Sequence, residues 1–232
     1  MPVDGNNVTY GYHYSIATTG NTNLEQSLPT VISSEDTQIT EYGGFYIARY
    51  EAGIPNTLIS AINDTSKRDV SGTPVSKKNQ VPWNYISWSK SKANAESMYE
   101  VKNNNNEVVV QSILLTDRMW ETTMQWLQKS GANVTSDSRG WGNYSDSKTP
   151  ANVSGYGTLQ NTGYSEYWKA KNIYDLAGNL WEWTNAKYDS SNYVFRGCSS
   201  GGSGTKFPAA FRNYRSESGE ISAGFRVALF VI

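Results

Sequence analysis

The sequence predicts a single α+β domain with two helices, short strands and long loops. A glycine-bearing turn within residues 173–184 runs straight into alternating rings and a carboxylate, which is typical of a turn that feeds a strand. An apolar stripe with helical spacing at 120–127 predicts a helix that buries one face. Alternating apolar residues at 227–231 predict a final strand with one side in the core.

The size and composition fit an ordinary folded globule. The chain has 232 residues, of which 38% are hydrophobic and 18% are charged, and this is enough for a sizeable core. The sequence shows no internal repeat and no linker that requires a second domain. We therefore expect one domain over residues 41–232, preceded by a polar lead-in at 1–40 with short strands at 8–15 and 28–32.

Composition disfavours several classes of function. A net charge of −1 provides no basic face for phosphates, so we expect no nucleic-acid partner. The sequence has no long apolar run, and its first residues show neither a basic nor an apolar leader segment. We therefore expect no membrane insertion and no export signal in this chain. With Cys198 and His13 as the sole residues of their types, disulfides, thiolate clusters, histidine metal sites and Ser-His-Asp catalysis are poorly supported.

The first expected elements of the domain are a strand and a helix. The strand lies within 44–52, where alternating apolar residues enter the core. Turn residues dominate the stretch that follows. A helix is then expected at 88–99, because Ala, Lys, Glu and Met favour helix and Ser87 or Ser89 can cap its start.

A second strand and the main helix are expected next. Four consecutive asparagines at 103–106 indicate an exposed turn, and a strand at 108–115 follows it. Thr116 can cap the main helix, with Asp117 in its first turn, where a negative charge suits the helix dipole. The buried stripe of this helix consists of Trp120, Met124 and Leu127.

The segment 130–167 is long, rich in Gly, Ser, Asn and Tyr, and has little periodicity. A loop of this length inside a compact domain is usually functional or held by its own packing. The whole chain contains 16 Tyr, 8 Trp and 20 Gly. Binding loops favour Tyr, Ser, Asn and Gly, although any loop-rich α+β domain has a similar composition.

The strand that ends the 173–184 segment carries the central polar residues. Trp181 and Trp183 share one face and point into the core, while Glu182 points the other way. Glu182 and Asp175, with nearby carbonyls, supply the oxygen ligands that hard cations such as Ca²⁺ prefer. Alternatively, Asp175 forms an Asx-turn and Glu182 forms a buried ion pair with an arginine. The candidate arginines are Arg196 and Arg226.

Three motifs in the second half of the chain carry a family resemblance. They are IYDLAGNLWEWT at 173–184, FRG at 195–197 and GFRVAL at 224–229. Together they resemble formylglycine-generating-enzyme-type domains, which have a C-type-lectin-like fold. Upstream, GFYIARYEAG from Gly44 resembles the family's first core strand, and LLTDRMWETTMQWL from Leu114 resembles its main helix, with Leu115 where the family usually has proline. The resemblance spans residues 42–232 and implies two helices around short twisted sheets.

The resemblance implies a structural Ca²⁺ ion at the central turn, where the family places an Asn or Asp, two carbonyls and a Glu. The matching positions here are Asp175, Gly178, Leu180 and Glu182. A second family site corresponds to Asn152 and Val153, but its acidic partner falls at Ser165.

Catalytic members of the family hold copper with two nearby cysteines, placed shortly after an RGGS-like turn. Here that turn is residues 196–199, and the stretch 200–212 has no cysteine. Alignment places Gly202 and Phe207 at the two thiol positions, and Cys198 stands where the family normally has glycine. Without soft ligands a Cu(I) site has nothing to bind it, so we expect no redox metal and no enzymatic activity.

The stretch after Arg196 alternates a fixed frame with small polar and aromatic residues. It resembles the C-terminal variable region of the variable proteins of diversity-generating retroelements, where adenine-directed mutagenesis produces Asn, Ser, Tyr, Asp, Gly and Phe. The alternative is an ordinary surface loop whose Phe and Tyr pack inward. The residues predicted to contact ligand are Tyr188, Asn192, Ser199, Ser200, Ser203, Thr205, Phe207, Phe211, Asn213, Tyr214, Ser216 and Glu217.

We therefore expect a non-catalytic receptor or adhesin that presents a diversified C-terminal surface to a protein or glycan on a target cell. By the resemblance, such proteins lie on phage tails or bacterial surfaces, and a phage virion component is the first expectation. One alternative is an oxidase of the family that works by a cysteine-free route. Another is a fixed structural module of a virion.

Overall fold

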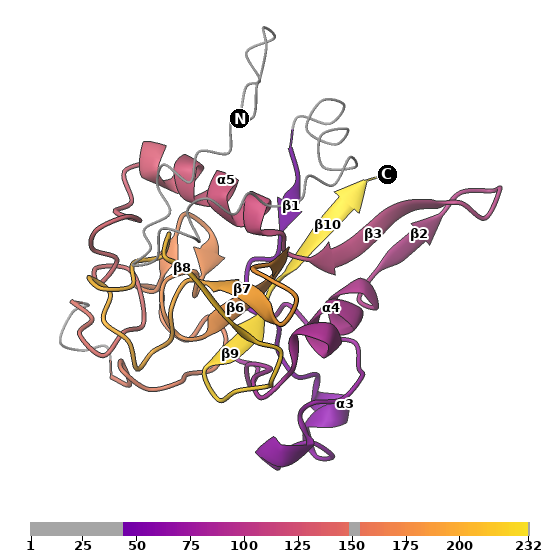
Figure 1. The fold of residues 1–232 in the computed structure, drawn as a ribbon, viewed down its shortest axis with the longest axis horizontal. Coiled ribbons are helices and arrows are strands. Elements are labelled where there is room, and N and C mark those ends of the chain that lie inside the picture. Colours follow the sequence, from indigo (N-terminus) through magenta and orange to yellow (C-terminus); the bar gives the residue numbers. More distant parts are fainter. Residues whose placement is uncertain (1–43, 149–153, 232) are drawn as a thin grey trace, which may run out of the picture.

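The computed structural model describes residues 44–148 and 154–231 (Figure 1). The helices are α3 (Asn56–Ile59), the 3-10 helix η1 (Thr65–Lys67), α4 (Trp88–Glu96) and α5 (Asp117–Lys129). The strands are β1 (Tyr46–Ile47), β2 (Glu100–Lys102), β3 (Val108–Leu114), β4 (Lys169–Ala170), β5 (Ile173–Tyr174), β6 (Trp181–Lys187), β7 (Asn192–Arg196), β8 (Arg212–Ser216), β9 (Ala223–Phe225) and β10 (Val227–Val231). The predicted α+β class with two main helices is confirmed.

Some predictions lie outside the described residues. These are the lead-in at 1–40 with its strands at 8–15 and 28–32, and the second calcium site at Asn152 and Val153. The described residues between α5 and β4 form no helix or strand, as the low periodicity of 130–167 predicts.

The two larger sheets meet near the C-terminus. The first has the strand order β1-β10-β3-β2, and every neighbouring pair is antiparallel. Tyr46 of β1 pairs with Leu229 of β10, which confirms the expected pairing of the terminal strand with the first strand of the domain. The second sheet has the order β8-β7-β6-β9, with β9 parallel to β6. Only Arg226 separates β9 from β10, so this residue lies where the chain passes from one sheet to the other.

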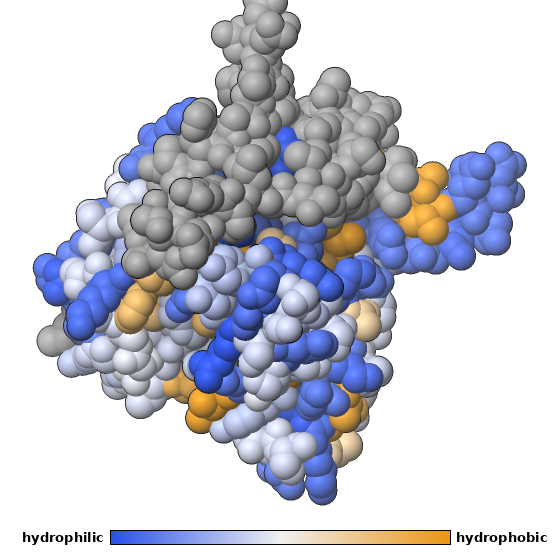
Figure 2. All heavy atoms as spheres, in the orientation of Figure 1, coloured by the Kyte–Doolittle hydropathy of each residue, from blue (hydrophilic) through white to orange (hydrophobic). Residues whose placement is uncertain are grey.

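The β2–β3 hairpin projects from the body of the molecule (Figure 1). Its tip holds the four asparagines, and Asn106 adopts a left-handed φ of 64°, which Asn tolerates better than most residues. Figure 2 shows hydrophobic side chains between this hydrophilic tip and the body. The hairpin joins the first sheet where Val110 pairs with Val231 of β10.

Helix α5 forms as its sequence predicts. The Thr116 side chain accepts a hydrogen bond from the backbone N–H of Met119 at 3.0 Å, which satisfies one free donor of the first turn. The predicted stripe of Trp120, Met124 and Leu127 is fully buried. Within the two described ranges, no helix is long and apolar enough to cross a membrane.

Helix α4 is shorter than predicted. Its N-cap is Ser87, whose hydroxyl accepts from the N–H of Lys90 at 3.4 Å. It ends at Glu96 and not at residue 99, because the chain turns toward β3 there. The N–H of Tyr99 donates to the Ser112 hydroxyl at 2.9 Å, so a partner in the sheet replaces the next helical bond.

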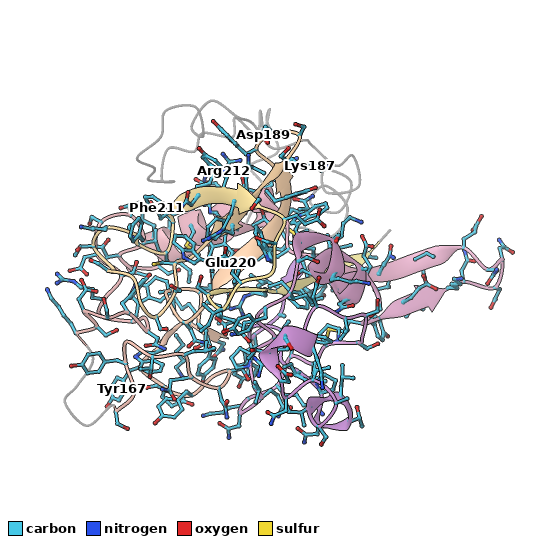
Figure 3. The ribbon with its side chains drawn as sticks, turned by 60° about the horizontal axis from the view of Figure 1, so that its bottom comes forward. Tyr167, Lys187, Asp189, Phe211, Arg212 and Glu220 are labelled. Carbon is cyan, nitrogen blue, oxygen red and sulfur yellow. The ribbon has the colours of Figure 1, made fainter. Side chains whose placement is uncertain are left out.

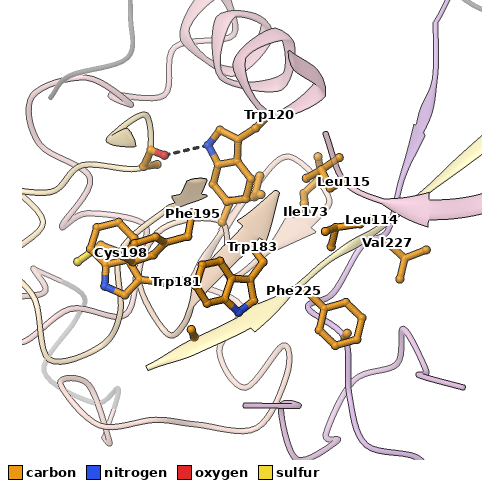
Figure 4. Close-up of a cluster of buried hydrophobic side chains, with 14 of the residues drawn as sticks. Leu114, Leu115, Trp120, Ile173, Trp181, Trp183, Phe195, Cys198, Phe225 and Val227 are labelled. Atoms are coloured by element: carbon orange, nitrogen blue, oxygen red, sulfur yellow. Dashed lines mark hydrogen bonds between the residues drawn. The ribbon is translucent and has the colours of Figure 1, made fainter. Parts of the chain in front are cut away.

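The core is built around tryptophans (Figure 4). Trp181 and Trp183 both pack against Phe195 of β7, with ring centroids 4.5 and 5.4 Å apart, so the predicted core face of this strand is confirmed. Trp120 of α5 donates its indole N–H to the carbonyl of Ala209 at 3.0 Å (Figure 4). That bond fastens the chain before β8 to the main helix.

Candidate ligand-binding surface

A buried ionic clamp closes the base of residues 197–211, which we call the C-terminal loop. Arg196 ends β7 and Arg212 begins β8, and the two residues pair in register. Arg196 Nη1 lies 2.9 Å from Asp117 Oδ1, and Arg212 Nε lies 2.7 Å from Asp117 Oδ2. Arg196 Nη2 also lies 2.9 Å from Glu121 Oε2. The first turn of α5 therefore holds both ends of the loop through one carboxylate.

The start of the C-terminal loop is hydrogen-bonded to the central turn, residues 175–180. Gly197 accepts the N–H of Gly178 at 2.8 Å, and the N–H of Ser200 donates to the carbonyl of Asn179 at 3.0 Å. Ser200 is only 7% exposed. The prediction that Ser200 faces a ligand is therefore corrected, because its backbone partner draws it under the loop.

The rings of the C-terminal loop pack inward. Phe207 and Phe211 meet edge to face at 4.9 Å, and they lie 6.0 and 6.2 Å from the ring of Trp181. Both are half-buried and pack against the main core. Because both rings share the apolar environment of Trp181, the packing favours the alternative of a loop with inward Phe over their predicted role as ligand anchors.

The middle of the C-terminal loop is tied to the preceding long segment. The Ser203 hydroxyl donates to Asp146 Oδ2 at 2.8 Å, and the N–H of Gly204 donates to Asp146 Oδ1 at 2.9 Å. Ser203 is consequently half-buried, as is Ser199, whereas Thr205 is exposed. Of the predicted contact residues in the loop, Thr205 has the freest side chain.

The remaining predicted residues gather around the β6–β7 hairpin and the edge strand β8. We call this set the outer surface, and it consists of Tyr188, Asn192, Asn213, Tyr214 and Ser216. The rings of Tyr188 and Tyr214 stack at 3.9 Å with an interplanar angle of 17°. They cover a small cluster with Ala186 and Val194 that is separate from the main core. Asn192 pairs in register with Ser216.

Glu217, the residue after β8, is hydrogen-bonded to the first turn of α4. Its carboxylate Oε1 accepts the N–H of Ser89 at 3.2 Å, in the first turn of α4. The N–H of Trp88 donates to the Glu217 carbonyl at 3.3 Å. A carboxylate at this end of a helix is favoured by the helix dipole. Glu217 therefore has a structural role at α4, and its predicted contact with ligand stays a prediction.

The sequence left open whether Glu182 forms an ion pair with Arg196 or with Arg226. In the structure Glu182 forms a buried ion pair. Arg226 Nε lies 2.9 Å from Glu182 Oε2, and Arg226 Nη2 lies 2.6 Å from Oε1. The guanidinium also donates to the carbonyls of Ala48 and Tyr174. Both charged side chains are almost fully buried. Of the two candidate arginines, Arg226 is the partner, and it ties the second sheet to the start of the domain.

Two more carboxylates are buried near this pair. Glu51 Oε2 accepts from the Asn179 side chain at 2.7 Å, and Asp175 Oδ2 accepts the N–H of Gly163 at 2.7 Å. Asp175 Oδ1 is buried without a hydrogen-bond partner among the described residues. Burial raises the pKa of Asp175 to about 7. Burial, followed by repulsion from Asp175 and Glu182, raises the pKa of Glu51 well above its ordinary value.

This acidic cluster suits the predicted Ca²⁺ ion in charge and donor type, because it offers an excess of carboxylate and a bare oxygen. The geometry departs from a ready cage in one respect. Both oxygens of Glu182 are bonded to Arg226, and no group of three or more His, Cys, Asp or Glu side chains poised to hold a metal is found at 44–148 or 154–231. Calcium at Asp175, Gly178, Leu180 and Glu182 stays a prediction.

Two carboxylates make structural contacts that were not predicted. One lies at the base of the C-terminal loop and the other at the central turn. Asp117 was expected to serve the helix dipole, and no bonding role was predicted for Glu51. Glu51 bonds the side chain of Asn179 and the N–H of Leu180 across the domain. The available signal was an acidic residue directly before the apolar run from Ala52 to Ile54, where a charge needs a buried partner.

The two positions that correspond to the family's thiols do lie together. A Cβ placed on Gly202 would meet Cys198 Sγ at 2.2 Å and the Phe207 ring at 3.6 Å. Cys198 is buried, and burial raises the pKa of its thiol to about 12. A single protonated thiol beside a glycine and a ring does not supply two thiolate ligands.

Comparison with known protein families finds a match over most of the chain. The FGE-sulfatase family model, described as the sulfatase-modifying factor enzyme 1-like domain, matches residues 6–230. No curated protein sequence matches the chain.

Solved structures are also similar to the chain, among them the three that follow. The crystal structure of CarF is 16% identical, covers 81% of this chain and 86% of its own, and has a TM-score of 0.47. Treponema denticola variable protein 1 is 18% identical over 77% and 84%, with a TM-score of 0.43. PvdO from Pseudomonas aeruginosa is 13% identical over 81% and 80%, with a TM-score of 0.49. The family assignment rests on the family model and not on these likenesses.

Proposed function

The chain belongs to the family of sulfatase-modifying factor enzyme 1-like domains, and from that premise we propose that it is a non-catalytic ligand-binding protein, a receptor or adhesin. The stacked pair of Tyr188 and Tyr214 on the outer surface carries the proposal. Both rings are partly exposed, and Asn192 and Ser216, which pair in register, lie on the same face of the β7–β8 pair as Tyr214 and supply adaptable hydrogen-bonding groups. Rigid rings among small polar residues are the composition that binding surfaces favour.

The frame beneath the outer surface supports this role. Strand β8 pairs with β7 over five registered positions, from Asn192–Ser216 to Arg196–Arg212. The Asp117 clamp then fixes the base of both strands. A surface that is already ordered loses less conformational freedom when it binds, so more of the contact energy appears as affinity.

The absence of catalysis in this proposal rests on the sequence at the family's copper site. The chain contains one cysteine, and the two matching positions are occupied by Gly202 and Phe207. Phe207 packs on Trp181, so the place of one thiol belongs to the aromatic core. With one buried thiol of raised pKa, soft-metal binding of the family's kind lacks its ligands.

Diversification of the outer surface is part of the proposal and rests on the pattern of residues after Arg196. Substitution at Asn213, Tyr214 or Ser216 changes side chains at the edge of the sheet and leaves the clamp intact. The target is a protein or glycan on a cell surface, and the protein acts from a phage tail or a bacterial surface. A structural Ca²⁺ ion at Asp175 and Glu182 would balance the buried acidic cluster and brace the central turn.

Cell adsorption tests the proposal. Fluorescently labelled protein is incubated with a panel of bacterial strains and measured by flow cytometry. We expect adsorption to at least one strain, and a loss of about tenfold or more in the double variant Y188A/Y214A, as expected when anchor rings are removed. The matched control Y46A, which removes an exposed ring on β1, retains adsorption.

Two results contradict the proposal. One is adsorption that the Y188A/Y214A variant leaves unchanged, because the outer surface then is not the site. The other is oxygen consumption when the purified protein is mixed with copper and a cysteine-containing peptide, because that reveals a catalytic member of the family.

A further inference from the structure

A second group of exposed rings lies far from the outer surface. Among the described residues, Tyr156, Tyr164 and Tyr167 are 50%, 41% and 48% exposed, although tyrosine carries a large apolar ring. Figure 3 places Tyr167 on the opposite side of the molecule from Lys187 and Asp189, which flank the outer surface. This group therefore belongs to a different face, which we call the tyrosine face (Tyr156, Tyr164 and Tyr167).

The three tyrosines belong to one region of the surface. Tyr164 and Tyr167 are three residues apart in the chain. The hydroxyl of Ser154, two residues before Tyr156, lies 3.4 Å from the Tyr164 hydroxyl. The folded segment 154–168 thus brings its two ends toward each other.

The backbone beneath the tyrosine face is firmly held. Thr162 is fully buried, and its N–H donates to the carbonyl of Gln80 at 2.9 Å while its carbonyl accepts the N–H of Asn79 at 2.8 Å. The Thr162 hydroxyl donates to the carbonyl of Lys77 at 2.5 Å. The next residue, Gly163, donates its N–H to Asp175. Exposed rings on a fixed backbone form a ready-made contact surface.

A buried tryptophan braces the central ring of the tyrosine face. Trp168 is fully buried and stacks with Tyr164 at 5.5 Å, with an interplanar angle of 26°. Tyr167 donates its backbone N–H to the Ser165 hydroxyl at 3.2 Å. The Tyr164 ring therefore has one face on Trp168, and the residue is still 41% exposed to solvent.

Polar groups of both kinds border these rings. Glu166 accepts from Lys78, Lys169 and the Tyr174 hydroxyl at 2.6–2.7 Å, and it remains 56% exposed. These hydrogen bonds, that from Lys169 first, lower the pKa of Glu166 to about 2, so the group is a charged acceptor at neutral pH. The exposed residues of the segment are Ser154, Tyr156, Thr158, Asn161, Tyr164, Glu166 and Tyr167.

We propose that the tyrosine face binds carbohydrate, with sugar rings stacked on its tyrosines and sugar hydroxyls bonded to Asn161, Glu166 and the ammonium groups beside them. The C–H groups of a sugar ring carry partial positive charge and suit the negative face of an aromatic ring. Amide, carboxylate and ammonium groups supply the donors and acceptors that hydroxyls need. The exposed set contains no aliphatic side chain, so each exposed group in it is an aromatic ring or a hydrogen-bonding group, the two kinds of group that a sugar contacts.

A printed array of defined oligosaccharides tests this assignment, with glucose, galactose, N-acetylglucosamine and sialic acid among the units. The purified chain is applied in EDTA, so that bound calcium contributes nothing, and the strongest binder is then titrated calorimetrically. We expect the double variant Y164S/Y167S to bind about tenfold more weakly or worse, as expected when anchor rings are lost. The variant Y164F/Y167F keeps both rings and is expected to retain most of the affinity.

Matched controls separate this face from the outer surface. Tyr46 is 67% exposed on β1, and Y46A is expected to leave sugar binding unchanged. The variant Y188A/Y214A is measured beside it to show which of the two surfaces holds the sugar. Circular dichroism and melting temperature show that each variant is folded. The assignment is overturned if no glycan binds, if Y164S/Y167S binds as tightly as the parent, or if Y188A/Y214A abolishes binding. The last result would place the sugar on the outer surface instead.

Discussion

The C-terminal loop and the outer surface contain the same kinds of residues, yet the fold uses them in opposite ways. In the loop, Phe207 and Phe211 turn inward against Trp181. On the outer surface, Tyr188 and Tyr214 stack on each other over a small separate cluster. A glycine- and serine-rich stretch with rings is therefore not by itself a binding surface, because its position on the frame decides which side chains meet solvent.

The difference follows from what lies beneath each region. The C-terminal loop crosses over the face of β6 that carries Trp181, so its rings have an apolar neighbour to cover. Strand β8 lies at the edge of its sheet, and beyond the Asp117 clamp its side chains meet a cluster of only two buried residues, Ala186 and Val194. Rings there cover less apolar area and remain available to a ligand.

The largest effect is expected at the clamp shared by the two regions. D117N keeps the shape of the side chain but leaves two buried guanidinium groups without their common counter-charge. Breaking a buried ion pair by removing one partner costs about 3–5 kcal/mol, and urea unfolding measures it. The control E100Q removes an exposed pair with Lys102 and is expected to cost about 0.5 kcal/mol or less. A loss equal to that of the control would show that the clamp does not hold the loop.

The next effect distinguishes inward rings from outward ones. F211A removes a ring that packs on Phe207 and Trp181, and it is expected to cost roughly 3 kcal/mol of unfolding free energy. T205A, six residues earlier and exposed, is expected to change stability by about 0.5 kcal/mol or less. If F211A matched T205A in denaturant melts, Phe211 would be free in solution and the comparison would fail.

Calcium is expected to act on the C-terminal loop more than on the outer surface. The central turn that would bind the ion accepts the N–H of Ser200 and donates to Gly197. A ligand at a hundred times its Kd stabilises the folded state by about 2.7 kcal/mol, so added Ca²⁺ should raise the Tm and EDTA should lower it. The variant E182Q should remove the response. An unchanged Tm in both conditions means that Ca²⁺ does not bind at the central turn and that Glu182 is paired with Arg226 alone.

The smallest effect on stability is expected on the outer surface. Y214A removes one ring of an exposed stack, so the cost should stay within about 1 kcal/mol, the range of such aromatic pairs beyond their buried area. N213S is expected to be within about 0.5 kcal/mol of the parent. Thermal melts measure both. A cost for Y214A as large as that of F211A would mean that the outer surface is part of the core and unsuited to diversification.

Local patterns predicted the frame well. The Thr116 cap needs only its own helix, and the alternation of Trp181 and Trp183 needs only its own strand. The pairing of β10 with β1 was predictable because both strands are short, apolar and close the domain. The cap and the alternation depend on residues a few positions apart, which a sequence displays directly, whereas β1 and β10 pair from opposite ends of the domain.

The side-chain assignments within the predicted surface depended on distant partners. Glu217 accepts the N–H of Ser89 in the first turn of α4, 128 residues earlier, and nothing near Glu217 in the chain indicates that bond. Phe207 resembles an anchor until Trp181 is placed beneath it. The choice between Arg196 and Arg226 as partner of Glu182 likewise required the crossing between the two sheets. Composition alone therefore could not separate inward residues from outward ones.

Sequencing the 3′ end of the gene across a population tests the central claim most directly, together with a search for a near-identical second copy of that segment nearby. The account predicts substitutions at codons whose second-copy bases are adenine, concentrated at outward positions such as Thr205, Asn213, Tyr214 and Ser216. It also predicts that Phe211 is spared. A uniform 3′ end without a second copy would contradict a diversified surface, as would substitutions that fall on inward and outward positions alike.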